Sequence, residues 1–128
     1  MAGTILVVDD SDTIRTLMLE LLLAEGFQVA TAADGHQALN ELTRCRPDLV
    51  LLDIEMPGLN GYEVCRRIKG HPETRELPVV LVSGITSQEG RYAGFEAGAD
   101  DYLSKPFFPG DLLGLIGTLL RSRAAPGS

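Results

Sequence analysis

The sequence predicts an α/β fold, a doubly wound five-stranded parallel sheet built from five successive strand–helix units, (βα)5. Short apolar runs alternate with helix-like segments along the chain, which is the pattern of a parallel sheet with helical crossovers. Several runs are apolar at every position, as expected of strands that helices cover on both faces. The chain has 128 residues and a hydrophobic fraction of 45%, which suits one globular domain and excludes a disordered chain.

The first half of the chain opens with the apolar run TILVV at 4–8, which predicts a buried strand. A helix is expected over 11–26, where apolar residues recur at helical spacing before a glycine stop. A shorter strand follows at 28–32, then a helix over 35–47 that a proline ends, and a buried strand, DLVLLD, at 48–53. The residues expected to face the core from the first helix are Ile14, Leu17, Met18, Leu21 and Leu22.

The second half of the chain continues the same alternation. The helix expected over 87–99 is weak, because Gly90 and Gly94 each cost about 1 kcal/mol relative to alanine. This weakness fits a movable element, and it fits equally a helix of merely low propensity. The remaining expected elements are a turn-rich loop at 56–61, helices at 61–69 and 110–123, a polar connection at 70–78, and strands at 79–83 and 101–105.

The composition excludes several classes of function. A net charge of −7 disfavours direct binding to nucleic acid. The N-terminus has neither the basic segment of a signal peptide nor an apolar stretch of membrane-spanning length, so we expect a cytoplasmic protein without membrane contact. Cys45 and Cys65 have no CxxC spacing and no histidine cluster beside them. We interpret both as small apolar helix residues and expect neither a disulfide nor a zinc site.

Polar residues end four of the five expected strands. Asp9 and Asp10 follow the first strand, Asp53 ends the third, Ser83 the fourth and Lys105 the fifth. Because the carboxyl ends of parallel strands meet at one edge of a sheet, these side chains are expected to converge there. Clustered carboxylates repel each other, and an oxygen-rich group of this kind suits Mg²⁺. The sequence therefore predicts a magnesium-binding site at this edge.

Each of these residues also has an ordinary interpretation when taken alone. Asp10 or Asp12 could cap the helix that follows, Ser83 could be a turn residue, and Lys105 could be a solvated surface charge. Their joint position at the ends of core strands favours a shared site. Phosphoryl transfer would use this inventory, because it needs a nucleophile, charge neutralisation and hydrogen-bond donors. Asp53 is the best candidate nucleophile, since it ends a central strand before a flexible loop.

Four stretches carry a resemblance to a known family: ILVVDDSD, PDLVLLDIEMPGLNGYEV, PVVLVSG and GADDYLSKPF, in this order and at the family's spacing. The chain resembles the receiver domain of two-component response regulators, the CheY-like family that includes the single-domain chemotaxis regulator. The resemblance covers 4–121. It implies a flavodoxin-like sheet of strand order 2-1-3-4-5, a receiver domain over 1–121, and a flexible tail or the start of a linker at 122–128.

The resemblance also implies roles for individual residues. Asp53 would be the phosphoacceptor. Asp10 and Asp53 would bind Mg²⁺ directly together with the backbone carbonyl of Glu55, and Asp9 would bind it through water. The Glu55 side chain stands two residues after the acceptor, where the family varies and tunes dephosphorylation. An acid at this position would alter the lifetime of the phosphate, in a direction that the sequence does not fix.

The remaining roles concern a switch. By resemblance, Ser83 would contact the phosphoryl group and Lys105 would pair with it. Tyr102 would be the aromatic switch residue that turns inward as Ser83 moves. The bond from Lys105 to Pro106 would be cis, an isomer that X–Pro bonds readily adopt.

The function implied is that of a phosphoacceptor switch. A sensor histidine kinase or a histidine phosphotransfer protein would donate the phosphoryl group from phosphohistidine. The face formed by the helix at 87–99, the strand at 101–105 and the helix at 110–123 would then shift to control an output protein or a fused effector domain. The chain would catalyse only its own phosphorylation and autodephosphorylation.

Two apolar surfaces are candidates for contacts with partners. One is the last helix, which could bind a partner or form a homodimer. The other comprises Leu19 and Leu23 of the first helix, which could meet a phosphotransfer helix. The apolar residues of the last helix are Leu112, Leu113, Leu115, Ile116, Leu119 and Leu120.

Two other classes of protein share this topology. An aspartyl-phosphate phosphatase would need an acid two residues after the nucleophile, which Glu55 offers, but the spacing of Ser83, Tyr102 and the Lys–Pro pair does not favour it. A flavodoxin-like binding module would need a loop after the first strand that holds phosphate. The acidic stretch DDSDT would repel it.

Overall fold

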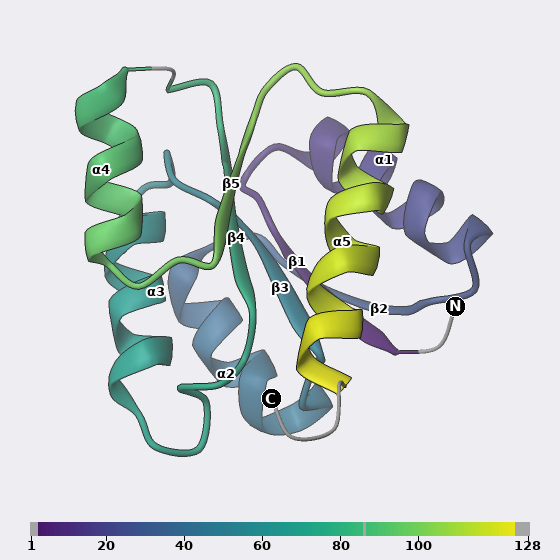
Figure 1. The fold of residues 1–128 in the computed structure, drawn as a ribbon, viewed down its shortest axis with the longest axis horizontal. Coiled ribbons are helices and arrows are strands. Elements are labelled where there is room, and N and C mark those ends of the chain that lie inside the picture. Colours follow the sequence, from purple (N-terminus) through teal and green to yellow (C-terminus); the bar gives the residue numbers. More distant parts are fainter. Residues whose placement is uncertain (1–2, 86, 125–128) are drawn as a thin grey trace.

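The computed structural model describes residues 3–85 and 87–124, and within these ranges a five-stranded sheet lies between five helices (Figure 1). The elements alternate strictly along the chain, as the sequence predicts. In chain order they are β1 (Thr4–Val8), α1 (Asp12–Ala24), β2 (Gln28–Ala32), α2 (Gly35–Cys45), β3 (Leu49–Asp53), α3 (Gly61–Gly70), β4 (Val79–Ser83), α4 (Gln88–Glu96), β5 (Asp101–Ser104) and α5 (Pro109–Ala124).

The sheet has the order β2-β1-β3-β4-β5, and every neighbouring pair is parallel. The predicted fold and strand order are therefore confirmed. After β1 the chain first adds β2 on one side and then β3 on the other, so the direction of the crossovers reverses between β1 and β3. Sheets of this kind bind ligands beyond the carboxyl ends of the strands at such a reversal point.

Two apolar layers cover the sheet, one on each face. One layer packs α2, α3 and the end of α4 against the sheet through residues such as Ala38, Ile68 and Ala97. The other packs α1 and α5 against the opposite face, with Leu22 and Ile116 fully buried. Strands β3 and β4 are buried at every position, which explains why their sequences are continuously apolar before the terminal polar residue.

Helix α1 departs from the expectation in two details. Ser11 caps it, because its hydroxyl accepts a hydrogen bond from the Ile14 N–H, so neither Asp10 nor Asp12 serves as the cap. Leu17 was expected in the core but is 47% exposed, since the helix turns Met18 toward the sheet and Leu17 away from it. Leu23 is also exposed, as the sequence suggests.

Two further predictions concerned a tail at 122–128 and an apolar surface on the last helix. Helix α5 runs to Ala124, so 122–124 are helical, and the tail at 125–128 lies outside the described residues. The apolar residues of α5 are buried or half-buried against the core. Large exposed apolar side chains instead occur at Leu17 and Leu23, at Tyr92 and Phe95 of α4, and at Phe108.

Two further predictions concern cysteines and membranes. Cys45 and Cys65 lie in helices α2 and α3, as predicted; both are free thiols, and Cys65 is buried. Burial raises the pKa of the Cys65 thiol to about 11, so the group stays neutral at physiological pH. Within the part of the chain described, no helix combines the length and apolarity that crossing a membrane requires.

Candidate functional site

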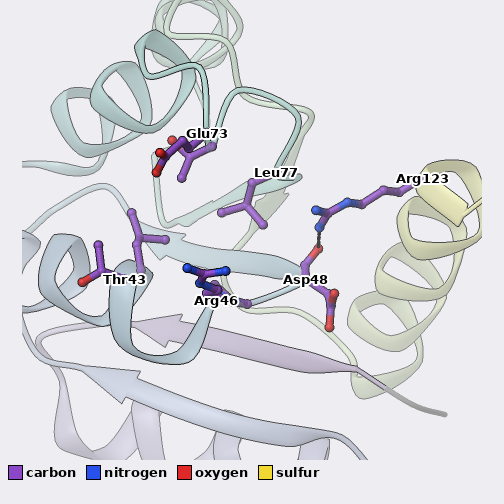
Figure 2. A pocket seen from close by; sticks show the side chains of 9 residues that line it. Thr43, Arg46, Asp48, Glu73, Leu77 and Arg123 are labelled. Atoms are coloured by element: carbon purple, nitrogen blue, oxygen red, sulfur yellow. Dashed lines mark hydrogen bonds between the residues drawn. The ribbon is translucent and has the colours of Figure 1, made fainter.

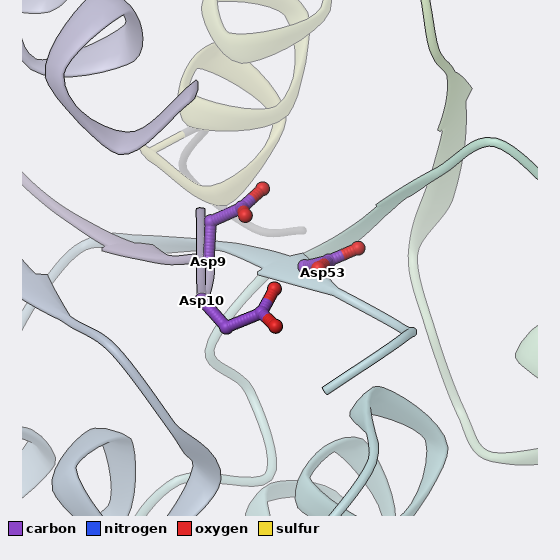
Figure 3. A group of neighbouring side chains, drawn as sticks. All are labelled: Asp9, Asp10 and Asp53. Atoms are coloured by element: carbon purple, nitrogen blue, oxygen red, sulfur yellow. The ribbon is translucent and has the colours of Figure 1, made fainter. Parts of the chain in front are cut away.

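Three carboxylates meet where β1 and β3 end. Asp9 and Asp10 follow β1, and Asp53 is the last residue of β3 (Figure 3). One oxygen of each lies within 4.8 Å of the others, so the three groups could share one cation. Asp9 is 1% and Asp53 5% exposed, whereas Asp10 is exposed to solvent. Acidic groups are seldom buried so deeply without a partner, which marks the cluster as more than a solvated surface.

Lys105 supplies a positive charge to this cluster. Its Nζ donates to Asp9 Oδ2 at 2.8 Å and to Asp53 Oδ1 at 3.4 Å. The other oxygen of Asp9 accepts the Ser11 N–H at 2.9 Å, so both Asp9 oxygens already have protein donors. The peptide bond from Lys105 to Pro106 is cis, as predicted. The sheet therefore brings together charges that lie far apart in the sequence.

The cluster perturbs its own acidity. Burial, and then repulsion from Asp9, raise the pKa of Asp53 to about 6, although Lys105 opposes the shift. Burial alone would lower the pKa of Lys105, but its hydrogen bond to Asp9 and the charge of Asp53 outweigh it and raise the pKa. The single positive charge of Lys105 thus does not neutralise the three carboxylates. A divalent cation would supply the remaining positive charge.

The local backbone holds Asp53 at this point. Gly61 opens α3 directly against the end of β3, and its N–H donates to the Ile54 carbonyl at 2.9 Å. A Cβ at Gly61 would overlap the carbonyl oxygen of Asp53, so only glycine fits. Asn60 and Glu63 form a reciprocal capping box that fixes the start of the helix. The turn formers of the sequence therefore set the position of Asp53.

Ser83 lies at the neighbouring strand end. It is 0% exposed, and its Oγ accepts the Ile85 N–H at 3.1 Å. The Ser83 hydroxyl donates to Glu55 Oε1 at 3.3 Å. The structure thus brings Ser83 to the predicted edge of the sheet, and its hydroxyl proton points to Glu55.

Tyr102 is turned inward. It is 5% exposed, and its hydroxyl donates to the Ile85 carbonyl at 2.6 Å. The guanidinium of Arg91 lies 5.2 Å from the centre of its ring, within the range of a cation–π contact. Burial raises the pKa of Tyr102, and the neighbouring Ser83 hydroxyl and the Arg91 charge counter this in part.

Sequence reasoning missed two contributors to this region. Arg91 covers the Tyr102 ring, and Tyr62 of α3 donates its hydroxyl to the Gly90 carbonyl at 2.8 Å. Each contact joins two different elements, and a single arginine or tyrosine in a helix carries no signal of it. The two glycines of α4 have a packing role, since a Cβ at Gly94 would lie 2.9 Å from the Leu81 side chain.

A pocket of about 510 Å³ lies at the opposite edge of the sheet, where the strands begin (Figure 2). Arg123 of α5 closes one side and donates to the Asp48 carbonyl at 2.8 Å. The Asp48 carboxylate accepts the Thr4 N–H at 2.8 Å. The pocket therefore contains charged residues that hold the backbone together. Its lining comprises Leu42, Thr43, Arg46, Pro47, Asp48, Glu73, Thr74, Leu77 and Arg123.

Comparison with known proteins identifies the family. Residues 5–117 match the family described as the response regulator receiver domain. The chain belongs to this family. It is 45% identical over 106 residues to the response regulator PleD of Caulobacter vibrioides, an alignment that covers 83% of this chain and 23% of PleD. The sequence-based assignment to two-component response regulators is confirmed.

Two further matches are a longer curated relative and a solved structure of similar length. The phosphate regulon transcriptional regulatory protein PhoB of Escherichia coli is 40% identical over 121 residues, which cover 94% of this chain and 53% of PhoB. The crystallised chemotaxis protein CheY4 of Vibrio cholerae is 32% identical with a TM-score of 0.88, covering 93% of this chain and 99% of that one. The chain spans about a quarter to a half of these curated relatives and nearly all of CheY4.

Proposed function

We propose that this receiver is a phosphoacceptor switch whose Asp53 takes a phosphoryl group from a phosphohistidine. The observation that carries the proposal is the buried Asp53 carboxylate beside two other carboxylates and one lysine. The donor would be a sensor histidine kinase or a histidine phosphotransfer protein. Family membership supports this function over a phosphatase or a flavodoxin-like module.

The cluster fits Mg²⁺ by its donor chemistry, because it offers hard oxygen ligands and an excess of negative charge. Asp10 and Asp53 would bind the ion directly, with the backbone carbonyl of Glu55 as the third protein ligand. Asp9 would contribute through water, since protein donors already occupy both of its oxygens. The bound cation would neutralise charge on the phosphoryl oxygens.

The side chains of the protein divide the transfer between them. An Asp53 oxygen would attack phosphorus in line as the bond from phosphorus to the histidine nitrogen breaks, and the histidine would leave with the electron pair. Lys105, which already contacts Asp53, would pair with a phosphoryl oxygen and balance the added negative charge. Ser83 would donate its hydroxyl to another of these oxygens. The product would be an aspartyl phosphate.

The output would pass through the face formed by α4, β5 and α5. Ser83 ends β4 and Lys105 directly follows β5, and Tyr102 of β5 packs beneath Arg91 of α4. The exposed Tyr92 and Phe95 offer apolar surface to a partner, which would be an output protein, a fused effector domain or a second copy. The larger relatives make a fused effector reasonable. A cytoplasmic location and activity limited to its own phosphorylation and dephosphorylation complete the proposal.

The proposal is tested by incubating the protein with acetyl phosphate and Mg²⁺ and measuring the intact mass. We expect the gain of one phosphoryl group, which chelation of Mg²⁺ prevents and Asp53→Asn abolishes. Asp111→Asn is the matched control, because Asp111 is an exposed acid in the first turn of α5 and should leave labelling unchanged. No gain of mass from any donor in the presence of Mg²⁺ would contradict the proposal, as would turnover of small phosphoesters.

A further inference from the structure

The Ser83 hydroxyl is engaged before any phosphoryl group arrives. Its oxygen accepts the Ile85 N–H, and its proton goes to Glu55 Oε1. Because Ser83 is fully buried, solvent does not compete for this proton. A serine hydroxyl has one proton and donates one hydrogen bond at a time. The group expected to bind the phosphoryl oxygen is therefore committed elsewhere.

Glu55 has its charge on the same side of the site as Ser83. Its carboxylate contributes to the raised pKa of both Tyr102 and Tyr62, after burial in each case. Lys105 pairs with Asp9 and Asp53, and among the described residues no cation pairs with Glu55. The Ser83 hydroxyl is thus the donor that the structure gives to the Glu55 side chain.

We propose that Glu55 holds the Ser83 hydroxyl away from Asp53 in the unphosphorylated protein and competes with the phosphoryl group for it. The inference rests on the proposed function of Asp53. A phosphoryl group would bring about −1.5 to −2 charge and strong acceptor oxygens to Asp53. The Ser83 hydroxyl must then give up its hydrogen bond to Glu55 and donate to a phosphoryl oxygen instead. The negative charges of Glu55 and the phosphoryl group repel each other at the same time. Glu55 is therefore a positioning residue that favours the unphosphorylated state.

Because Tyr102 is already inward, the change that phosphorylation would still bring is the transfer of the Ser83 hydrogen bond from Glu55 to the phosphoryl group. The Tyr102 hydroxyl already donates to the Ile85 carbonyl, and Arg91 lies over its ring. Tyr102 is thus already inward in this structure while the Ser83 hydroxyl faces Glu55. Release of Ser83 from Glu55, without rotation of Tyr102, would register phosphorylation.

The test measures binding of beryllofluoride, an anionic analogue of the phosphoryl group, by calorimetry at saturating Mg²⁺. The variants are Glu55→Ala, Ser83→Ala and the double variant. Loss of one competing hydrogen bond predicts that Glu55→Ala binds about two- to tenfold more tightly than the wild type. In the Ser83→Ala background the gain should shrink, because the two residues act as a pair. Glu89→Ala removes another exposed acid, from the first turn of α4, and should bind like the wild type.

A second measurement needs no bound anion. The Ile85 N–H donates to Ser83 Oγ, so the ¹H–¹⁵N resonance of Ile85 should shift in Glu55→Ala and not in Glu89→Ala. An unchanged Ile85 resonance would overturn the inference, and so would equal binding by the wild type and Glu55→Ala. An equal gain with and without Ser83 would reduce the role of Glu55 to charge repulsion and overturn the competition. Failure of the wild type to bind the analogue would instead remove the proposed function and, with it, this inference.

Discussion

Charged residues lie at both ends of the strands, and their roles differ between the two. We call the side where the strands end the carboxyl edge and the side where they begin the amino edge. At the carboxyl edge, Asp9, Asp53 and Lys105 turn buried charges toward one another. At the amino edge, the Asp48 carboxylate binds the Thr4 N–H of β1, and Arg123 binds the Asp48 carbonyl just before β3. The amino edge has the 510 Å³ pocket, and two of the charged residues that line it, Asp48 and Arg123, are already hydrogen-bonded to backbone groups. We therefore base the proposed site on converging, partly uncompensated charge and not on cavity volume.

The largest effect should come from breaking the backbone contact that positions the carboxyl edge. Gly61→Ala would press a Cβ against the Asp53 carbonyl and destabilise the fold by about 2–3 kcal/mol. The matched control is Gly114→Ala in α5, where a Cβ meets open space and helix propensity predicts a gain of about 0.5–1 kcal/mol. Urea unfolding of both variants measures the difference. Equal effects would show that the close approach does not fix Asp53.

Removing the buried charge should have the next largest effect, with the opposite sign. The pKa of Asp53 is about 6 in the folded protein and near 3.8 in the unfolded chain, so folding penalises its charged form. Without Mg²⁺, Asp53→Asn should therefore be about 1–3 kcal/mol more stable than the wild type above pH 6. This advantage should fade as the pH falls from 6 toward 4. Denaturation curves across this range test it, and an advantage independent of pH would argue against a penalised charge.

The next prediction concerns Mg²⁺ binding by Asp10 at the carboxyl edge. Asp10 is exposed and has no cation beside it among the described residues, which leaves its oxygens available for Mg²⁺. Asp10→Asn should weaken Mg²⁺ binding by about tenfold or more. Asp12→Asn is the control, because Asp12 pairs with Arg15 and lies outside the carboxylate cluster. Calorimetric titration with Mg²⁺ compares the two, and equal affinities would place the ion elsewhere.

The amino edge should give the smallest effect. Arg123→Ala removes one exposed hydrogen bond to the Asp48 carbonyl, so it should cost less than about 1 kcal/mol. Labelling of Asp53 by acetyl phosphate should proceed as in the wild type. Thermal unfolding and intact mass measure the two quantities. A large loss of labelling would mean that the two edges are coupled.

The sequence could predict the fold and the residues at the carboxyl edge because both follow from the backbone. Asp53 and Ser83 end core strands, Asp9 and Lys105 directly follow them, and a parallel sheet places all such ends together. The cis bond before Pro106 and the family assignment followed from motifs at fixed spacing. These predictions needed no knowledge of side-chain direction.

The predictions that failed or were missing depended on how side chains pack in three dimensions. The exposure of Leu17 depends on how far α1 is rotated about its axis, which an apolar helix with several possible stripes does not fix. Two contacts join different elements of the fold: the hydrogen bond from Ser83 to Glu55 and the stacking of Arg91 on Tyr102. No local pattern encodes such contacts.

The two glycines of α4 carry a consequence for amide hydrogen exchange. A helix of nine residues with Gly90 and Gly94 gains little from its own backbone and depends on packing against Ile85, Leu81 and Tyr102. Its amide protons would then exchange with solvent as one cooperative unit, opening when those contacts open. The rate at which α4 takes up deuterium would report how firmly Tyr102 is held. Hydrogen exchange in α4 would thus report on the packing of β5 beside it.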